Sequence, residues 1–112
     1  MKYIISVFQP SKLDAVREAL SKFGVSGMTV SEVRGYGRQL GKSEIYRGAE
    51  YEVLFIPKIK LEVAVSSDVA KDVIDTIRKT AATDKIGDGK IFIMDLEQAV
   101  RIRTGEEGAD AL

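Results

Sequence analysis

The feature that most constrains the fold is a succession of apolar patterns that occurs twice along the chain. In the first half, a β-branched apolar run over residues 2–8 precedes a helical repeat and an alternating stretch over 28–33. In the second half, alternation over 58–65 precedes another helical repeat and an apolar run from Lys90. Because a period of two residues predicts a strand and one of about 3.6 a helix, the order is strand, helix, strand, twice.

Two helices are expected between these strands. The first is predicted to begin at a capping box formed by Ser11 and Asp14 and to end at Gly24. The second is predicted to begin in the polar run 66–68 and to end near Ala82. Their apolar stripes are Leu13, Val16, Leu20 and Phe23 in the first helix and Val69, Val73, Ile74 and Ile77 in the second.

This order predicts one domain over residues 1–112 with an α+β fold, the ferredoxin-like double βαβ sandwich. Two helices can cover only one face of a four-stranded sheet. The other face is expected to carry Ala64 and Val30 among charged residues. It either meets another subunit or a ligand, which we favour, or is solvated as antiparallel sheets tolerate.

A stretch of about 20 residues, from Gly35 to Pro57, separates the two halves. No helical or strand period covers it before Glu52. Connections of this length in a compact domain are usually either functional or disordered. The residues alone leave both interpretations open.

The composition excludes several kinds of chemistry. The chain has no Cys and no His, so it has no disulfide, thiolate nucleophile, catalytic triad or zinc site built on these residues. A bound metal would be a hard cation held by oxygen atoms, such as magnesium on phosphates. The 17 basic and 17 acidic residues balance, which gives no indication of a nucleic-acid or membrane surface. Without a signal-like or membrane-spanning apolar run, a cytoplasmic location is expected.

Three short segments are candidates for binding an anion. In GYGR (35–38) and GDGK (87–90), paired glycines allow the backbone to approach a phosphate and the final basic residue can neutralise it. In Arg101-Ile102-Arg103, a strand-like backbone would project both guanidinium groups to one side. Each also has an ordinary interpretation, a glycine-containing turn in the first two and a charged edge strand in the third. Residues 104–112 are predicted to form a polar, mobile tail.

Two longer motifs point to a family. The loop contains YRGAEY (46–51), and the second half contains TDKIGDGKIFIMDL (83–96). KLDAVREAL, GMTVSEVRGYGRQ, FIPKIKLEV and VRIRTGE agree as well, in register and without gaps. On these segments the sequence resembles the PII nitrogen-signalling proteins over essentially its full length.

The resemblance implies a homotrimer with three nucleotide sites in the clefts between subunits. The long stretch, about 36–56, corresponds to the family's T-loop, which docks on partner proteins. ATP and ADP would compete for each cleft, and Mg²⁺ and 2-oxoglutarate would join ATP at the base of the loop. Such a protein is a signal integrator and not an enzyme, so no catalytic residue is expected.

The resemblance also assigns residues. Thr29 and Ala64 would lie near the adenine, and Arg101 and Arg103 would reach across the site. The phosphates would be held by Gly37, Arg38, Gln39, Gly87, Asp88, Gly89 and Lys90. Gln39 would be the magnesium ligand, and 2-oxoglutarate would contact Gly37, Gln39, Gly41, Lys58 and Gly87, with Lys58 at its distal carboxylate. Tyr51 is the position that a nucleotidyltransferase modifies in many relatives.

The sequence departs from the family pattern at Gln9, where a basic residue is common near the 2-oxoglutarate carboxylate. The other departures are Leu40 for Lys, Glu52 for an apolar residue, Leu54 for Asp and Ala64 for Val.

The expected function is regulation of nitrogen assimilation through binding, with an ammonium transporter or nitrogen-metabolism enzymes and regulators as partners. The protein would then be cytoplasmic and reversibly membrane-associated through its partner. One alternative is a paralogue with an altered effector response, given Gln9 and Leu54. Less favoured are a slow nucleotide hydrolase and an RRM-like RNA binder, since residues 58–65 lack the aromatic side chains that stack on RNA bases.

Overall fold

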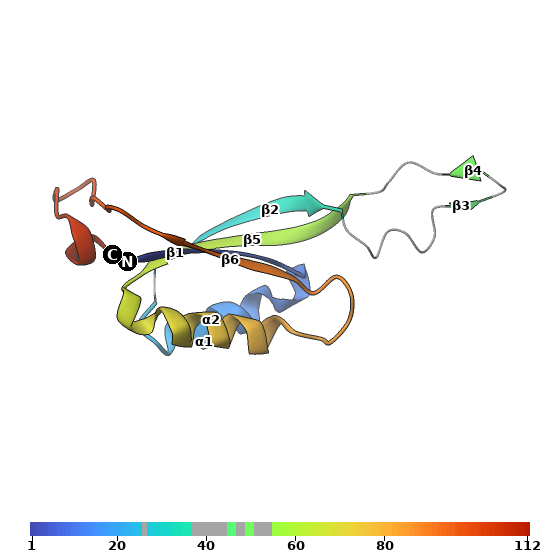
Figure 1. The fold of residues 1–112 in the computed structure, drawn as a ribbon, viewed down its shortest axis with the longest axis horizontal. Coiled ribbons are helices and arrows are strands. Elements are labelled where there is room, and N and C mark those ends of the chain that lie inside the picture. The colour runs from blue at the N-terminus through green and yellow to red at the C-terminus, as the bar shows by residue number, and fades with distance from the viewer. Residues whose placement is uncertain (26, 37–44, 47–48, 51–54) are drawn as a thin grey trace.

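The computed structural model describes residues 1–25, 27–36, 45–46, 49–50 and 55–112. A four-stranded antiparallel sheet forms one layer, and two helices lie on one of its faces (Figure 1). This confirms the predicted α+β, ferredoxin-like arrangement.

The sheet has the strand order β2-β5-β1-β6. Its members are β1 (Lys2–Phe8), β2 (Thr29–Gly35), β5 (Ile56–Val65) and β6 (Gly89–Asp95). The covering helices are α1 (Leu13–Ser21) and α2 (Ser67–Ala81). Two short strands, β3 (Ile45–Tyr46) and β4 (Ala49–Glu50), pair with each other within the long connection between β2 and β5.

The hydrophobic core lies between the sheet and the two helices. Strand β5 shows why, because its apolar residues alternate and all four that face the helices are at most 5 % exposed. They pack with residues of β1, both helices and the segment before β2. The core residues are Ile4, Phe8, Val16, Leu20, Val25, Ile59, Leu61, Val63, Val65, Ala70, Val73, Ile77 and Ala81. Phe23, expected in the stripe of the first helix, lies beyond α1 and is 43 % exposed.

The sheet face opposite the helices, called the open face below, differs in part from the expectation. Val30 pairs with the buried Leu61, so it lies on the helix side, and the prediction for Val30 is wrong. Residues directly opposite each other share a face, which instead places Val33 on the open face together with Ala64. The other apolar positions of the open face are Tyr3, Ile5, Val7, Phe92 and Met94.

The start of α1 also differs from the prediction. Pro10 begins a 3₁₀ turn, η1 (Pro10–Lys12), because its fixed φ suits the first turn of a helix. The α-helix then starts at Leu13 with Lys12 at its cap. The predicted capping box of Ser11 and Asp14 is therefore wrong.

The C-terminal residues fold back on the domain instead of forming the expected mobile tail. Val100 bridges to Glu107, and the amide of Gly108 donates to the carbonyl of Ala99 at 2.9 Å. A 3₁₀ turn, η3 (Gly108–Ala111), follows and lies near the N-terminal end of β1 (Figure 1). Backbone bonds hold this segment although its composition is polar.

Gly89 is expected to tolerate no side chain. Its φ is +114°, and a Cβ added there would lie 1.8 Å from the carbonyl oxygen of Val7. We expect Gly89→Ala to lower the free energy of unfolding by more than about 2 kcal/mol, measured by urea denaturation. Gly27→Ala is the matched control, because nothing lies within 4 Å of a Cβ at that position. Equal stabilities of the two variants would contradict this account.

Candidate functional site

The residues predicted to bind ligands form two groups at opposite ends of the sheet. Thr29 and Ala64 lie at the end that carries the chain termini, whereas Lys58 and the 87–90 turn lie beside the base of the long connection (Figure 1). The six steps along β5 from Lys58 to Ala64 span about 20 Å at about 3.3 Å per residue. One protomer therefore does not bring the two groups into a single pocket. We call them the loop group and the terminal group.

The loop group is organised around the carbonyl oxygen of Gly87. The ammonium group of Lys58 donates a hydrogen bond to this oxygen, and the side-chain amide of Gln9 donates a second at 3.0 Å. Lys58 lies on the open face, opposite Val33, and is nevertheless only 6 % exposed. Burial lowers the pKa of the Lys58 ammonium, and the negative charge of Asp88 partly opposes this shift. The result is a buried cation held at the base of the long connection.

Gly35 lies against the Lys58 side chain. A Cβ at position 35 would be 3.4 Å from Cγ of Lys58, a van der Waals contact. Beyond this point Tyr36 and Phe55 pack edge to face, with ring centroids 5.9 Å apart. The two chain segments that leave the sheet are thus joined by an aromatic pair.

Asp88 shapes the turn that presents Gly87. Its carboxylate accepts hydrogen bonds from the backbone amides of Thr83, at 2.7 Å, and Asp84, at 2.9 Å, and from the Thr83 hydroxyl. These bonds hold the pKa of the Asp88 carboxyl below its usual value, with the Thr83 hydroxyl the largest cause. The five-residue spacing of Thr83 and Asp88 was present in the sequence as part of a motif, but its structural meaning was missed.

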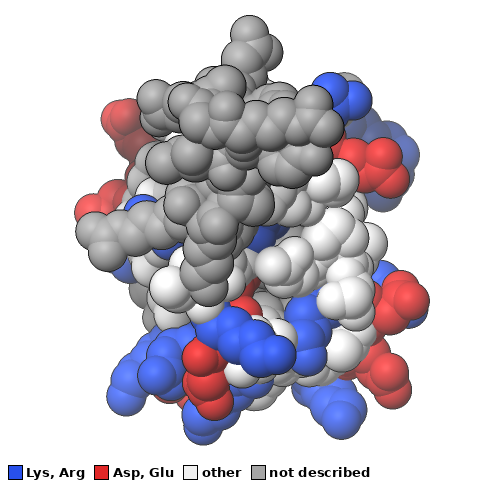
Figure 2. Space-filling view, turned by 90° about the vertical axis from the view of Figure 1, so that its right-hand side faces the viewer, with Lys and Arg blue, Asp and Glu red and all other residues white. Residues whose placement is uncertain are grey.

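Around the loop end of the molecule, basic and acidic side chains are interspersed below the residues drawn in grey (Figure 2). This view fits the balanced composition, since neither sign of charge dominates the face shown. Local placement of single cations, such as the buried Lys58, therefore matters more here than a broad electrostatic field.

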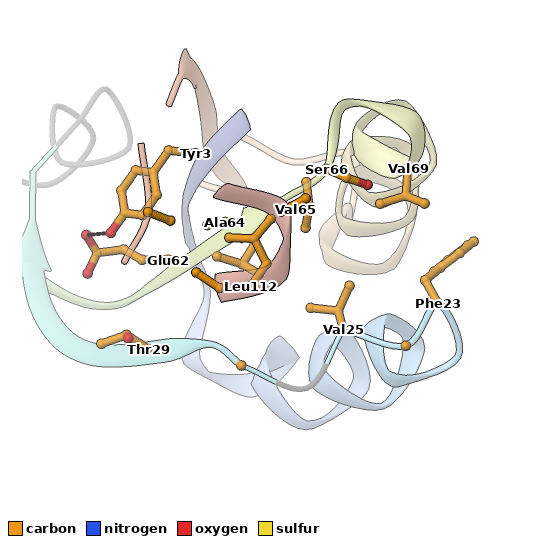
Figure 3. Close-up of a pocket in the computed structure, with 16 residues that line it drawn as sticks. Tyr3, Phe23, Val25, Thr29, Glu62, Ala64, Val65, Ser66, Val69 and Leu112 are labelled. Atoms are coloured by element: carbon orange, nitrogen blue, oxygen red, sulfur yellow. Dashed lines mark hydrogen bonds between the residues drawn. The ribbon is translucent and has the colours of Figure 1, made fainter. Parts of the chain in front are cut away.

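The terminal group lines a cavity of about 580 Å³. Thr29 and Ala64 both face it, as expected of residues near one ligand group (Figure 3). Tyr3 and Glu62 lie beside them, and the Tyr3 hydroxyl donates to Glu62 Oε1 at 2.9 Å. No role had been expected for these two residues, because the pairing of β1 with β5 is not visible in the sequence.

Arg101 and Arg103 lie in a turn over residues 101–105, so the prediction of a strand-like backbone here is wrong. The amide of Gly105 donates to the carbonyl of Arg101 at 2.8 Å, which closes the turn. The Arg101 guanidinium donates to Glu106 Oε1 and to the carbonyl oxygen of Leu112, each at 3.2 Å. Leu112 lines the cavity of the terminal group, so Arg101 is connected to that cavity.

Several expected site residues lie outside the described part of the chain. They are Gly37, Arg38, Gln39, Gly41 and Tyr51, together with the variant positions Leu40, Glu52 and Leu54. Within the described part, there is no group of three or more acidic side chains that could hold a metal ion. None of the described helices is long and apolar enough to cross a membrane.

Comparison with known proteins places the chain in a family. The family model described as "Nitrogen regulatory protein P-II" matches residues 1–106. The "Nitrogen regulatory protein P-II" of Haemophilus influenzae is 58 % identical, and that of Pasteurella multocida is 56 % identical. "Nitrogen regulatory protein P-II 1" of Escherichia coli strain K12 is 55 % identical, and all three alignments span 112 residues, 100 % of each chain.

The chain belongs to the PII family of nitrogen regulatory proteins. Its role is therefore one of signalling in nitrogen regulation. Members of this family are signalling regulators that interact with the regulators and enzymes of nitrogen metabolism.

The contribution of Asp88 to stability is expected to depend on pH. Because the folded-state pKa lies below the unfolded value of about 3.9, the contribution is present at neutral pH and is lost as the pH falls below about 4. Urea denaturation between pH 7 and pH 3 should show a steeper loss of stability in the native protein than in Asp88→Asn. Asp75→Asn, an exposed carboxylate of α2, is the control and should follow the native curve.

Proposed function

We propose that the protein senses ATP or ADP together with 2-oxoglutarate, and that it regulates nitrogen assimilation by docking its long loop on partners such as an ammonium transporter. Membership of the PII family supports the regulatory role. The observation that carries the ligand proposal is the separation of the loop group from the terminal group along β5. Two half-sites at opposite ends of one protomer become a whole site only between neighbouring protomers.

A homotrimer would join these half-sites. In such an assembly, the terminal group of one protomer would meet the loop group of the next in each cleft. The open face supports this arrangement, since Phe92 and Met94 are 51 % and 45 % exposed in the single chain. Apolar side chains that are half exposed on a sheet face favour burial against another subunit.

The nucleotide would lie across each cleft. Thr29 and Ala64 would contact the adenine, and Arg101 and Arg103 would reach the phosphates from the same protomer. From the neighbour, the phosphates would be held by Gly37, Arg38, Gln39, Gly87, Asp88, Gly89 and Lys90. The Gln39 side-chain oxygen would bind Mg²⁺, which commonly uses few protein ligands when phosphate oxygens are present.

The buried Lys58 ammonium fits a carboxylate of 2-oxoglutarate. In the structure its described partner is a neutral carbonyl, that of Gly87. A carboxylate is a stronger partner for an ammonium group than a carbonyl, because both groups carry charge. Exchange of one partner for the other would change the base of the loop and so favour one loop conformation, with Gly37, Gln39 and Gly41 in contact with the ligand.

Regulation would occur through binding and not through catalysis. Ammonium transporters are the proposed membrane-bound partners, so an otherwise cytoplasmic protein would associate reversibly with the membrane. A nucleotidyltransferase acting on Tyr51 would add charge and bulk to the docking loop. Gln9 favours an alternative in which the effector response differs from that of relatives, because it places a neutral amide beside Gly87.

Lys58 provides the test of the effector proposal. We expect Lys58→Met to weaken 2-oxoglutarate binding in the presence of Mg²⁺ and ATP by more than about tenfold, since the buried cation is lost. ADP binding should change less than 2-oxoglutarate binding, because Lys58 reaches the proposed phosphate contacts only through the Gly87 carbonyl. Isothermal titration calorimetry measures both, and Lys60→Met, two residues further along β5, is the matched control. Failure of the native protein to bind 2-oxoglutarate with Mg²⁺ and ATP would overturn the proposal.

Phe92 provides the test of assembly. We expect the native protein to have three times the protomer mass by light scattering, and Phe92→Glu to shift the population toward smaller species, because it buries a charge at the subunit contact. Lys71→Glu is the control, since Lys71 is exposed on α2, on the other side of the sheet from the open face. A native protein that is monomeric at micromolar concentration would contradict the trimer.

A further inference from the structure

Tyr3 occupies a position on the open face that brings it into the terminal group. It is opposite Ala64 in the register of β1 and β5, while Glu62 is opposite Thr29 in the register of β5 and β2. These four residues are therefore neighbours on one face of the sheet. All four line the cavity of about 580 Å³ (Figure 3).

The hydrogen bond from Tyr3 fixes one oxygen atom of Glu62. The phenol donates to Oε1 at 2.9 Å, and the ammonium nitrogen of Lys60 lies 3.8 Å from the same atom. Within the part of the chain that the structure describes, both contacts fall on Oε1 and neither falls on Oε2. The Glu62 side chain is 20 % exposed, so its second oxygen is an acceptor at a partly enclosed surface.

The phenol is a dependable donor at neutral pH. Its bond to the Glu62 carboxylate raises the pKa of Tyr3, with burial and the carboxylate charge as further causes. Tyr3 therefore stays protonated and Glu62 keeps one oxygen engaged under physiological conditions. A carboxylate held in this way loses less side-chain freedom when a ligand binds than a mobile one would.

We propose that Tyr3 is a positioning residue of the nucleoside half-site, which holds Glu62 so that its second oxygen accepts a hydrogen bond from the bound nucleoside. This inference rests on the proposed nucleotide function. Apolar side chains also line this cavity, among them Ala64, Val65 and Leu112. An aligned carboxylate on such a wall selects a ligand with a donor group and rejects one that presents only an acceptor there.

Two groups of an adenine nucleotide can supply that donor, the exocyclic amine of the base and the ribose hydroxyls. ITP carries a carbonyl oxygen in place of the amine, and 2′-deoxy-ATP lacks one ribose hydroxyl. The analogue that binds more weakly than ATP to the native protein identifies the group that Glu62 recognises.

The experiment compares Tyr3→Phe with the native full-length protein in calorimetric titrations with ATP, ITP and 2′-deoxy-ATP. Tyr3→Phe keeps the aromatic ring and removes only the hydroxyl. We expect it to weaken ATP binding by about three- to tenfold, and to weaken the binding of the discriminated analogue much less. The ratio of the affinity for ATP to the affinity for that analogue should therefore be smaller in Tyr3→Phe than in the native protein. In a Glu62→Gln background, Tyr3→Phe should have little further effect, because Tyr3 acts through Glu62.

Thr76→Val is the matched control, since it removes a hydroxyl on α2, outside both ligand groups, and should leave the preference unchanged. An equal loss of affinity for all three nucleotides would show that Tyr3 is only structural, and unchanged affinities would show that it has no role. Either outcome overturns the inference while nucleotide binding stands. If the native protein binds none of the three nucleotides, the proposed function fails and the inference fails with it.

Discussion

The arrangement of the loop end depends on one carbonyl oxygen, that of Gly87, which accepts hydrogen bonds from Lys58 and Gln9. Through these bonds the 83–88 turn is tied both to β5 and to the end of β1. Asp88 shapes the turn from within, and Gly89 lets β6 leave it against β1 without a steric clash. The turn, the sheet and the start of the long connection are thus one unit, and a change at Lys58 would be felt in all three.

The second constraint is the length of the strands. A protomer carries its two half-sites about 20 Å apart on a sheet that is too stiff to bring them together. Assembly is then required for the proposed ligand site to exist at all, and the uncovered apolar residues of the open face supply a driving force for it. Under the proposed function, this geometry links fold, oligomeric state and ligand binding.

The sequence predicted the elements well where a period dominated. The alternation of β5 gave all four of its buried apolar residues, whereas the helical repeat of α2 gave Val73 and Ile77 but missed Ala70 and Ala81. Prediction from the sequence failed where a single contact decides the burial or the backbone conformation of a residue. Lys58 is buried by a bond to a turn almost thirty residues away, and Arg101 begins a turn that backbone bonds close. Val30 was assigned to the wrong face because its face depends on how β2 pairs with β5, and this register cannot be obtained from the alternation within β2 alone.

In the candidate site too, the contacts between distant residues could not be predicted from the sequence. These contacts also indicate which part of the protein can act as a switch. Strand β5 joins the terminal group to the loop group. A rigid strand has only one conformation, so it cannot itself switch between two states. Lys58 does offer such a choice, since its ammonium can bond the Gly87 carbonyl or, under the proposed function, a ligand carboxylate. Because only a ligand with different affinities for two states shifts their balance, the effector signal would enter at Lys58. The nucleotide half-site would then determine whether a cleft contains a nucleotide. Lys58 would determine the conformation in which the long loop leaves the sheet.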